Sequence, residues 1–193
     1  NHTSSLLDGS SYSNFLTVTG VQNPPPALSS LLVPGGLFYS PSMFRPQKPG
    51  TYFNYSNIEF GVLGTIIEKV TGIRFDIWIK ANILSPLNIK GSFNIQDITD
   101  INNVAVLYRF EGGHWVPQAD NYLGVMPEAR DLSNYIIGSN GLVFSPAGGL
   151  RISGPDLSRF MLMFMNNGIY NGTRILNDST CRLLRTPQWT YLG

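Results

Sequence analysis

The stretch over residues 49–72 constrains the fold more than any other part of the chain. A Pro-Gly pair at its start favours a turn, and Ser56 and Glu59 have the S-x-x-E spacing of a capping box. In that motif the serine hydroxyl accepts a hydrogen bond from the amide three residues on, and the carboxylate reaches back to the cap. We therefore predict a helix that starts at Asn57 and stops at Gly72.

The predicted helix carries an apolar stripe along one side. Its spacing is that of an amphipathic helix, so we expect this face to be buried. Upstream, Tyr55 precedes the cap, where a contact with Phe60 would fix the angle at which the chain enters the helix. A tyrosine is thus held at a helix N-terminus, two residues before Asn57. The stripe consists of Ile58, Val62, Ile66 and Val70, broadened by Leu63 and Ile67.

Composition favours a folded globule and excludes several classes of partner. The 193 residues suffice for one core, and 42% of them are hydrophobic and 12% aromatic. With 13 basic and 12 acidic residues and no basic run, we expect no nucleic-acid partner. No apolar run approaches the ~20 residues that a membrane span requires. Charged residues make up only 13%, against about 25% in a usual domain, so we expect a large face to be covered by something outside this chain.

Cysteine and histidine usage argues against a metal or another cofactor. Cys181 is the one cysteine, which excludes an internal disulfide, and its helical surroundings predict a buried thiol. His2 and His114 lack ligand spacing, and we interpret His114 as a surface residue. Four N-x-S/T acceptors support the hypothesis of a secreted or extracytoplasmic protein; they are Asn1, Asn54, Asn171 and Asn177.

The remaining elements follow from periodicity and turn signals. Residues 1–48 are predicted to be loop-rich, either as a surface linker or as a lid over a cleft. A helical face formed by Phe75, Ile79 and Ile83 ends at Pro86, and residues 104–116 predict a hairpin. Ser153 and Asp156 predict a capped helix with a buried stripe. Asn171-Gly172 predicts a tight hairpin turn, and a short helix is expected around Cys181. That stripe is Leu157, Phe160, Met161 and Phe164.

Residues 49–87 resemble the serine β-lactamase and penicillin-binding-protein superfamily, particularly class C β-lactamases, D-alanyl-D-alanine carboxypeptidases and related esterases. Those proteins carry a Pro-Gly-x-x-x-x-Tyr-Ser-Asn run, then Leu-Gly-x-x-x-Glu and a Pro-Leu pair. The matching residues here are Pro49, Gly50, Tyr55, Ser56, Asn57, Leu63, Gly64, Glu68, Gly72, Pro86 and Leu87.

Two further segments carry the same resemblance. Residues 2–8 are similar to the superfamily's His-Thr-Ser-Gly-Leu segment, with Ser5 where a glycine is usual. Residues 146–160 resemble its Gly-Gly-Leu-x-Ser-x-x-Asp-Leu segment; the matches are Gly148, Gly149, Leu150, Ser153, Asp156 and Leu157.

The resemblance implies an α+β fold of the β-lactamase/transpeptidase type. We expect mainly the helical subdomain with short hairpins, and much of the flanking antiparallel sheet outside this chain. One partial domain would then comprise the possible lid at 1–48, a helical region at 49–145 and the glycine segment, helix and hairpin at 146–193. By the same resemblance Tyr55 would be the catalytic proton shuttle and Asn57 would hydrogen-bond the substrate's amide. Gly148 and Gly149 would let backbone approach the substrate closely.

The nucleophile of such an enzyme is missing from this chain. Acyl transfer in the superfamily needs a serine with a lysine one helical turn later, so that the amine reaches the hydroxyl. The residues three positions before the lysines are Arg45, Ile66, Ile77 and Leu87, and no Lys-Thr-Gly or His-x-Gly follows late in the chain. We therefore expect an internal fragment of a serine hydrolase that acts on a β-lactam, a D-amino-acid peptide or an ester. The rest of its own domain is then an expected partner.

Two alternatives stay open. The first is a non-catalytic descendant that binds peptides or proteins, or serves as a scaffold. The second is an unrelated helical interaction domain. The match of two separate segments to the superfamily, in the right order, argues against it. A Ser-x-x-Lys in sequence that precedes His2 would favour the enzyme over the binding protein.

Overall fold

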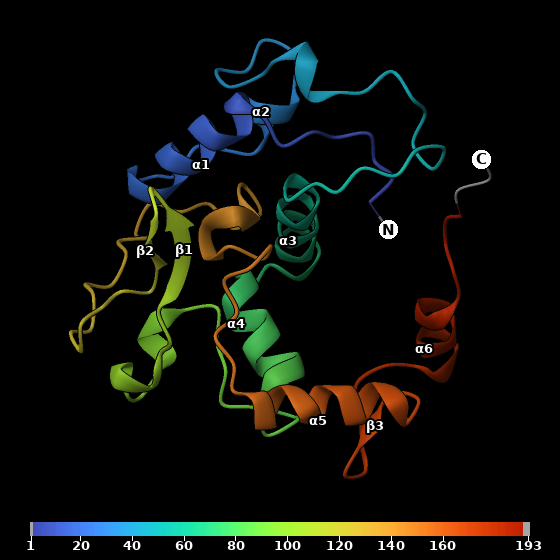
Figure 1. Ribbon diagram of the computed structural model, residues 1–193. Helices are drawn as coiled ribbons and strands as arrows, with labels where there is room; N and C mark the ends of the chain where they lie inside the picture. Colours follow the sequence, from blue (N-terminus) through green and yellow to red (C-terminus); the bar gives the residue numbers. More distant parts are fainter. Residues whose placement is uncertain (1, 191–193) are drawn as a thin grey trace.

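We describe residues 2–190 from a computed structural model. Helices and two small antiparallel hairpins make up the chain (Figure 1), as expected for the α+β class. The helices are α1 (Ser10–Val21), α2 (Ser29–Leu32), α3 (Ile58–Thr71), α4 (Phe75–Ile79), α5 (Gly154–Met165) and α6 (Asp178–Arg185). The strands are β1 (Leu107–Glu111), β2 (His114–Ala119), β3 (Ile169–Tyr170) and β4 (Thr173–Arg174). Among the shorter turns, η2 (Lys80–Leu84) continues α4 and η5 (Gly141–Phe144) packs on α3.

A first hydrophobic core joins the N-terminal segment to α3 and η5. The segment before residue 49 supplies five of its seven buried members, so it packs as part of the core. Our prediction of a loop-rich segment missed the 12-residue helix α1, because serine and asparagine read as turn residues. Its buried residues nevertheless recur at helical spacing. The core consists of Tyr12, Phe15, Leu28, Leu31, Met43, Ile58 and Leu142.

The predicted stripe of α3 was wrong in part. Ile58 is buried and Val62 packs against the first core as predicted, but Ile66 and Val70 are 50% and 80% exposed, and Leu63 is 56% exposed. The other buried positions are Gly61, Gly64 and Glu68. Two glycines on that face let the helix backbone approach η5 closely, which no row of larger side chains would allow.

The contact between α3 and η5 leaves little room for side chains at its glycines. A Cβ added at Gly141 would lie 2.3 Å from the carbonyl carbon of Gly64, so it would meet backbone, and one at Gly61 would lie 2.4 Å from Cγ of the Leu142 side chain. Both distances are shorter than non-bonded carbon atoms allow. A Cβ at Gly64 would lie a tight 3.1 Å from the Gly141 carbonyl oxygen, so these glycines let α3 lie close to η5.

A second core lies beneath α4, η2 and α5. Ile79 and Ile83 pack against it, as the predicted helical face requires. In α5 the predicted stripe was wrong in part, since Leu157 and Met161 are 46% and 49% exposed and the fully buried residue is Met163. The buried members of this core are Leu84, Leu87, Ile89 and Met163.

Both predicted hairpins are present. Strands β1 and β2 pair around Gly112 and Gly113, with Glu111 opposite His114, which is exposed as we interpreted it. Strands β3 and β4 pair around Asn171-Gly172, where both residues have positive φ. Cys181 is a buried free thiol, as predicted.

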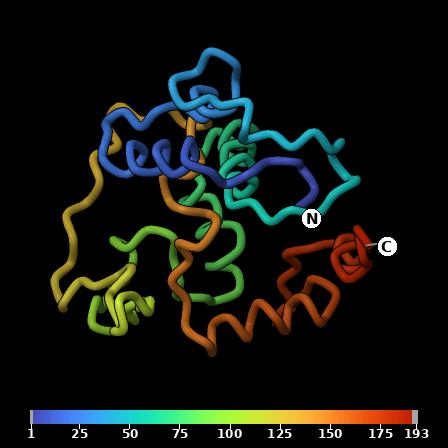
Figure 2. The backbone as a smooth tube through the Cα atoms, turned by 45° about the horizontal axis from the view of Figure 1, so that its top comes forward, coloured from blue at the N-terminus to red at the C-terminus, as the bar shows by residue number. Residues whose placement is uncertain are grey.

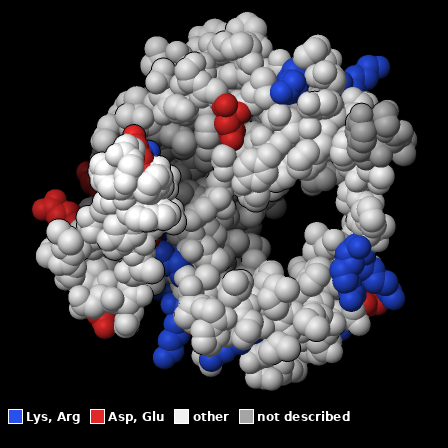
Figure 3. Space-filling view, viewed as in Figure 1, with Lys and Arg blue, Asp and Glu red and all other residues white. Residues whose placement is uncertain are grey.

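The helices α3 to α6 surround an opening. Figure 3 shows this opening and the few charged side chains on the surrounding face, and Figure 2 shows the C-terminal segment turning back toward the N-terminal one. There the rings of Phe53 and Trp189 lie 5.8 Å apart. In the described part of the chain, no helix is both long and apolar enough to cross a membrane.

Candidate active site

Tyr55 and Asn57 lie together at the start of α3. The Tyr55 hydroxyl is 3.4 Å from Oδ1 of Asn57, and Tyr55 is 53% exposed. The residues that alternate with them, Ser56 and Ile58, are fully buried. Ser56 and Ile58 thus anchor the start of the helix in the interior, while the Tyr55 phenol and the Asn57 carboxamide face outward.

The N-terminus of α3 is capped by Asp8, which lies 48 residues before Ser56. One carboxylate oxygen accepts from the Ser56 hydroxyl at 3.0 Å and from the Ile58 amide at 3.2 Å. The other accepts from the amide and the side-chain Nδ2 of Asn57, both at 2.7 Å. A carboxylate at this position also faces the positive end of the helix dipole, which stabilises the negative charge.

The predicted capping box between Ser56 and Glu59 is therefore wrong. The helix begins at Ile58 after Asn57, one residue later than predicted, and no side chain of its own segment caps it. The Glu59 carboxylate instead accepts from the amide and hydroxyl of Ser4 and lies 3.0 Å from Nδ1 of His2. Asp8 takes over the cap because it offers an ionised acceptor where the local pattern offers a hydroxyl.

His2 brings the first segment against the candidate site. Its ring lies 4.3 Å from that of Tyr55 and 5.5 Å from that of Phe60. The predicted contact between Tyr55 and Phe60 is present, with the two ring centres 6.5 Å apart. The phenol of Tyr55 is therefore held on one side by aromatic contacts and on the other by the Asn57 carboxamide.

Tyr12 of α1 lies beneath this cluster. Burial raises the pKa of its phenol to about 12, and the negative charges of Asp8 and of ionised Tyr55 act in the same direction. The environment around Asp8 thus disfavours a second anion. Tyr12 accordingly stays a neutral phenol below strongly alkaline pH.

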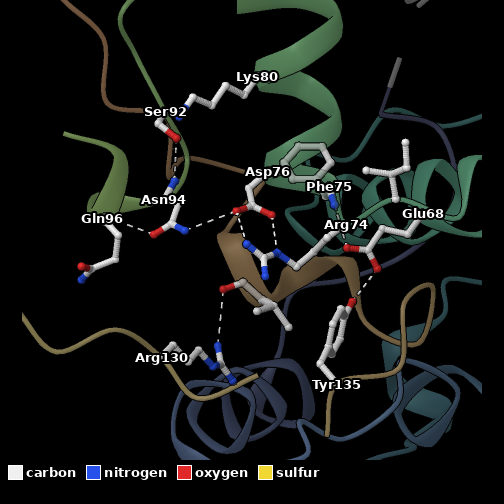
Figure 4. Close-up of polar contacts among 12 residues, drawn as sticks. Glu68, Arg74, Phe75, Asp76, Lys80, Ser92, Asn94, Gln96, Arg130 and Tyr135 are labelled. Atoms are coloured by element: carbon white, nitrogen blue, oxygen red, sulfur yellow. Dashed lines mark hydrogen bonds and ion pairs between the residues drawn. The ribbon is translucent and has the colours of Figure 1, made fainter. Parts of the chain in front are cut away.

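Glu68 secures the other end of α3 (Figure 4). Its carboxylate is 1% exposed and accepts from the amides of Phe75 and Gly138, at 2.9 and 2.8 Å, and from the Tyr135 hydroxyl. Burial and then the Glu68 hydrogen bond raise the pKa of Tyr135. This matched glutamate of the resemblance is therefore structural, since it ties α3 to α4 and to the loop before η5.

Beside Glu68, Arg74 and Asp76 form a two-pronged ion pair at 2.6 and 2.8 Å (Figure 4). The guanidinium also lies over the Phe144 ring, 4.8 Å from its centre. Asn94 donates to the same carboxylate at 3.4 Å. These contacts hold together the junction of α3, α4 and η5 at the end of α3 away from Tyr55.

Gly148 and Gly149 lie in a turn after η5. Both of their amides donate to the carbonyl of Ser145, at 3.0 and 2.7 Å. A Cβ at Gly149 would lie 2.9 Å from the Phe144 carbonyl oxygen, so its own turn requires a glycine there. No contact among the described residues joins either glycine to Tyr55, and their role in binding a substrate stays a prediction.

Other polar features lie away from Tyr55. A cavity of about 720 Å³ is bordered by Lys80, Lys90 and Asp100, and within it Arg151 pairs with Asp120 at 2.6 Å. Over residues 2–190, no group of three or more His, Cys, Asp or Glu side chains could hold a metal ion. Sequence reasoning missed Asp8 and Ser4 as parts of the site, although both lie in the resembling residues 2–8, and it assigned Glu59 to a capping box rather than to Ser4 and His2.

Comparisons with known proteins place this arrangement in a family. A sequence model of the β-lactamase family matches residues 38–192. Penicillin-binding protein 4 of Amycolatopsis lactamdurans is 26% identical over 138 residues, which cover 71% of this chain and 32% of the relative. Beta-lactamase-like protein 1 of Dictyostelium discoideum is 35% identical over 107 residues, which cover 54% of this chain and 14% of the relative.

A solved structure shares the fold. The octameric penicillin-binding protein homologue from Pyrococcus abyssi superposes with a TM-score of 0.55 and 23% identity, over 94% of this chain and 39% of that one. The helices and small antiparallel hairpins thus define a partial β-lactamase/transpeptidase-like fold. The chain belongs to the β-lactamase family, as the sequence resemblance predicted, and it spans about a third of the length of Penicillin-binding protein 4.

Proposed function

We propose that this chain is part of a serine hydrolase that acts by acyl transfer on an amide or ester. The observation that carries the proposal is the pair of Tyr55 and Asn57, 3.4 Å apart, outward-facing and fixed from below at the start of α3. Tyr55 acts as the proton shuttle, because a phenol can take a proton from a hydroxyl nucleophile and return it to the leaving group. Asn57 hydrogen-bonds the substrate, and Gly148 and Gly149 leave room for it.

In this proposal the nucleophile belongs to a part of the parent protein outside these 193 residues. None of the four lysines follows a serine or threonine at the spacing that the chemistry needs. The matched portion is 32% of Penicillin-binding protein 4 and 39% of the Pyrococcus abyssi homologue, which leaves length for a segment that carries it.

The exposed apolar residues of α3, α5 and α6 support the same proposal. α3, α5 and α6 each leave large hydrophobic side chains half exposed or more, which is unusual for a surface that faces water. We infer that the rest of the parent domain covers this face and brings the nucleophile toward Tyr55. The residues concerned are Leu63, Ile66, Val70, Leu162, Met165, Leu183 and Leu184.

The test is turnover by this chain beside the full-length protein. A chromogenic ester and a chromogenic β-lactam serve as substrates, and intact mass reports a covalent acyl group. We expect turnover and acylation only in the full-length protein, with a large loss of kcat in Tyr55→Phe, because removing a general acid-base group costs about 10²–10⁴-fold. Full activity in Tyr55→Phe would remove Tyr55 from the mechanism.

A non-catalytic binding or scaffold protein is the second candidate, favoured by the lack of a serine-lysine pair in this chain. It predicts no acylation by any substrate in the full-length protein, together with saturable binding of a peptide. The same two measurements therefore separate the candidates.

A further inference from the structure

Asp8 does more at the start of α3 than cap a helix. Two of its four hydrogen bonds go to Asn57, one to the backbone amide and one to the side-chain Nδ2, both at 2.7 Å. A helix cap needs only the backbone donors. The bond to the side chain bears on the candidate site itself.

The chemistry of a carboxylate decides how the Asn57 carboxamide is oriented. An ionised carboxylate accepts hydrogen bonds and cannot donate them, so the group of Asn57 that faces Asp8 must be the NH₂. The carbonyl oxygen then points the other way, where it lies 3.4 Å from the Tyr55 hydroxyl. The orientation thus follows from the charge of Asp8, independently of how the oxygen and nitrogen atoms are assigned.

Asp8 is itself held in place by the backbone on its N-terminal side. The Leu7 amide donates to the Met43 carbonyl at 2.9 Å, and Leu6 forms a bridge with Phe44. The Ser56 hydroxyl and the Ile58 amide occupy the carboxylate oxygen that Asn57 does not use. Because both its backbone and its carboxylate are held, Asp8 can keep the Asn57 side chain in one rotamer.

We propose that Asp8 is a positioning residue: it fixes Asn57 with the carbonyl oxygen toward Tyr55, so that the pair presents a hydrogen-bond acceptor and a phenol in one geometry. Asp8 touches neither substrate nor nucleophile and acts through Asn57. The catalytic consequence rests on the proposed function, whereas the orientation of Asn57 stands apart from it.

The first experiment measures that orientation in this chain without any substrate. NMR resolves the side-chain NH₂ protons of asparagine, and a bond to a carboxylate shifts them downfield and slows their exchange with water. We expect both effects for Asn57 in the native chain and their loss in Asp8→Asn, whose neutral amide offers a single acceptor oxygen. Unchanged Asn57 signals in Asp8→Asn would overturn the proposal.

Asp100 offers a matched control. Its carboxylate accepts from the amide and side chain of Asn102 and from the side chain of Asn103, at the start of the turn η4 (Ile101–Asn103). Asp100→Asn is expected to change the signals of these two asparagines and to leave Asn57 alone. If Asp8→Asn fails to fold, Asp8→Glu is the second variant, because it keeps both acceptor oxygens. We expect it to retain the downfield Asn57 signal. Loss of that signal in a folded Asp8→Glu would also count against the proposal.

The second experiment uses the full-length protein. Asp8→Asn is expected to lower kcat by about tenfold to a hundredfold with KM little changed, the scale on which misplaced reacting groups act. Added to Asn57→Ala, it should lower kcat no further, because its effect passes through Asn57. Additive losses would show a purely structural role. A full-length protein that turns over neither substrate refutes the proposed function, while the NMR result still decides the role of Asp8.

Discussion

At the scale of single residues, Glu68 is the most heavily constrained side chain on α3. Its carboxylate satisfies two backbone amides and one hydroxyl in a place that water does not reach. A buried donor that loses its acceptor costs about 1–3 kcal/mol. Removing this one carboxylate leaves all three donors, two amides and one hydroxyl, without this acceptor.

We therefore expect Glu68→Ala to lower the free energy of unfolding by about 3 kcal/mol or more. Urea unfolding followed by circular dichroism measures the change. Glu128→Ala is the control, because Glu128 is exposed and its loss should stay within about 0.5 kcal/mol. Equal effects of the two variants would show that the Glu68 contacts contribute nothing.

Tyr12 predicts a loss of stability in alkali. Its folded pKa of about 12 lies above the unfolded value of about 10, so the unfolded state loses a proton first as pH rises. The stabilisation is complete below pH ~10 and is lost as pH rises toward ~12, at no more than about 1.4 kcal/mol per pH unit. Tyr135, whose pKa is also raised, adds to the loss.

The measurement is urea unfolding of the native chain and of Tyr12→Phe between pH 7 and 11. The variant should show a shallower decline above pH 10, and the comparison at pH 7 reports any packing cost of the substitution. A decline of the same steepness in both proteins would mean that Tyr12 does not contribute to it.

The residues of the candidate site show where sequence reasoning succeeds and where it stops. Tyr55 and Asn57 were proposed as site residues because the Tyr-Ser-Asn run resembles that of the superfamily, and the structure brings them together. Asp8 could not be found from local spacing, because it reaches the start of α3 from 48 residues earlier. A capping box is a local pattern, and here a distant ionised acceptor displaces it.

At the scale of elements, the contact of α3 with η5 depends on positions without side chains. We expect Gly141→Ala to destabilise the chain by about 3 kcal/mol, the upper end of the usual cost of overpacking, since its Cβ would meet backbone rather than a movable side chain. Gly61→Ala should also destabilise, because the clash with Leu142 outweighs the better helix propensity of alanine.

Gly20→Ala in α1 is the matched control for this prediction. No atom lies within 4 Å of the Cβ that it would add. The substitution should therefore stabilise by up to about 1 kcal/mol through helix propensity alone. Thermal unfolding of the three variants tests the difference, and a stabilised Gly141→Ala would contradict the packing described.

From residue 49 on, element positions were largely predictable from the sequence, but the buried faces of α3 and α5 were predicted only in part. Turn residues and caps give the end of α3 at Gly72, the cap of α5 at Ser153 and both hairpins. Hydrophobic periodicity says which residues share a face. It does not say which face meets the core when glycines permit a closer approach. In α3 the buried face is the one that carries Gly61 and Gly64.

At the scale of the whole molecule, the exposed apolar side chains of α3 test whether the rest of the parent domain covers this helix. Ile66 and Val70 face water here, so replacing both by lysine should change stability by less than about 0.5 kcal/mol per site and reduce binding of a hydrophobic dye. In the full-length protein the same changes should cost about 2 kcal/mol each or more, as expected for buried aliphatic side chains.

Val21→Lys is the control, since Val21 is 83% exposed on α1 and should be neutral in both proteins. Unfolding midpoints of the two lengths of protein are compared for each variant. If Ile66→Lys and Val70→Lys are as harmless in the full-length protein as in this chain, the remainder of the domain does not cover α3.

The backbone contact of Gly64 with Gly141 also limits how such a sequence can change over generations. In an ordinary core, a larger residue at one position can be offset by a smaller one beside it. Gly141 meets main-chain atoms, which every amino acid shares, so no second substitution can make room for a first. The helix that follows Tyr55 is thus placed by a contact that side chains would prevent, and selection can keep that arrangement or lose it, with few intermediate steps.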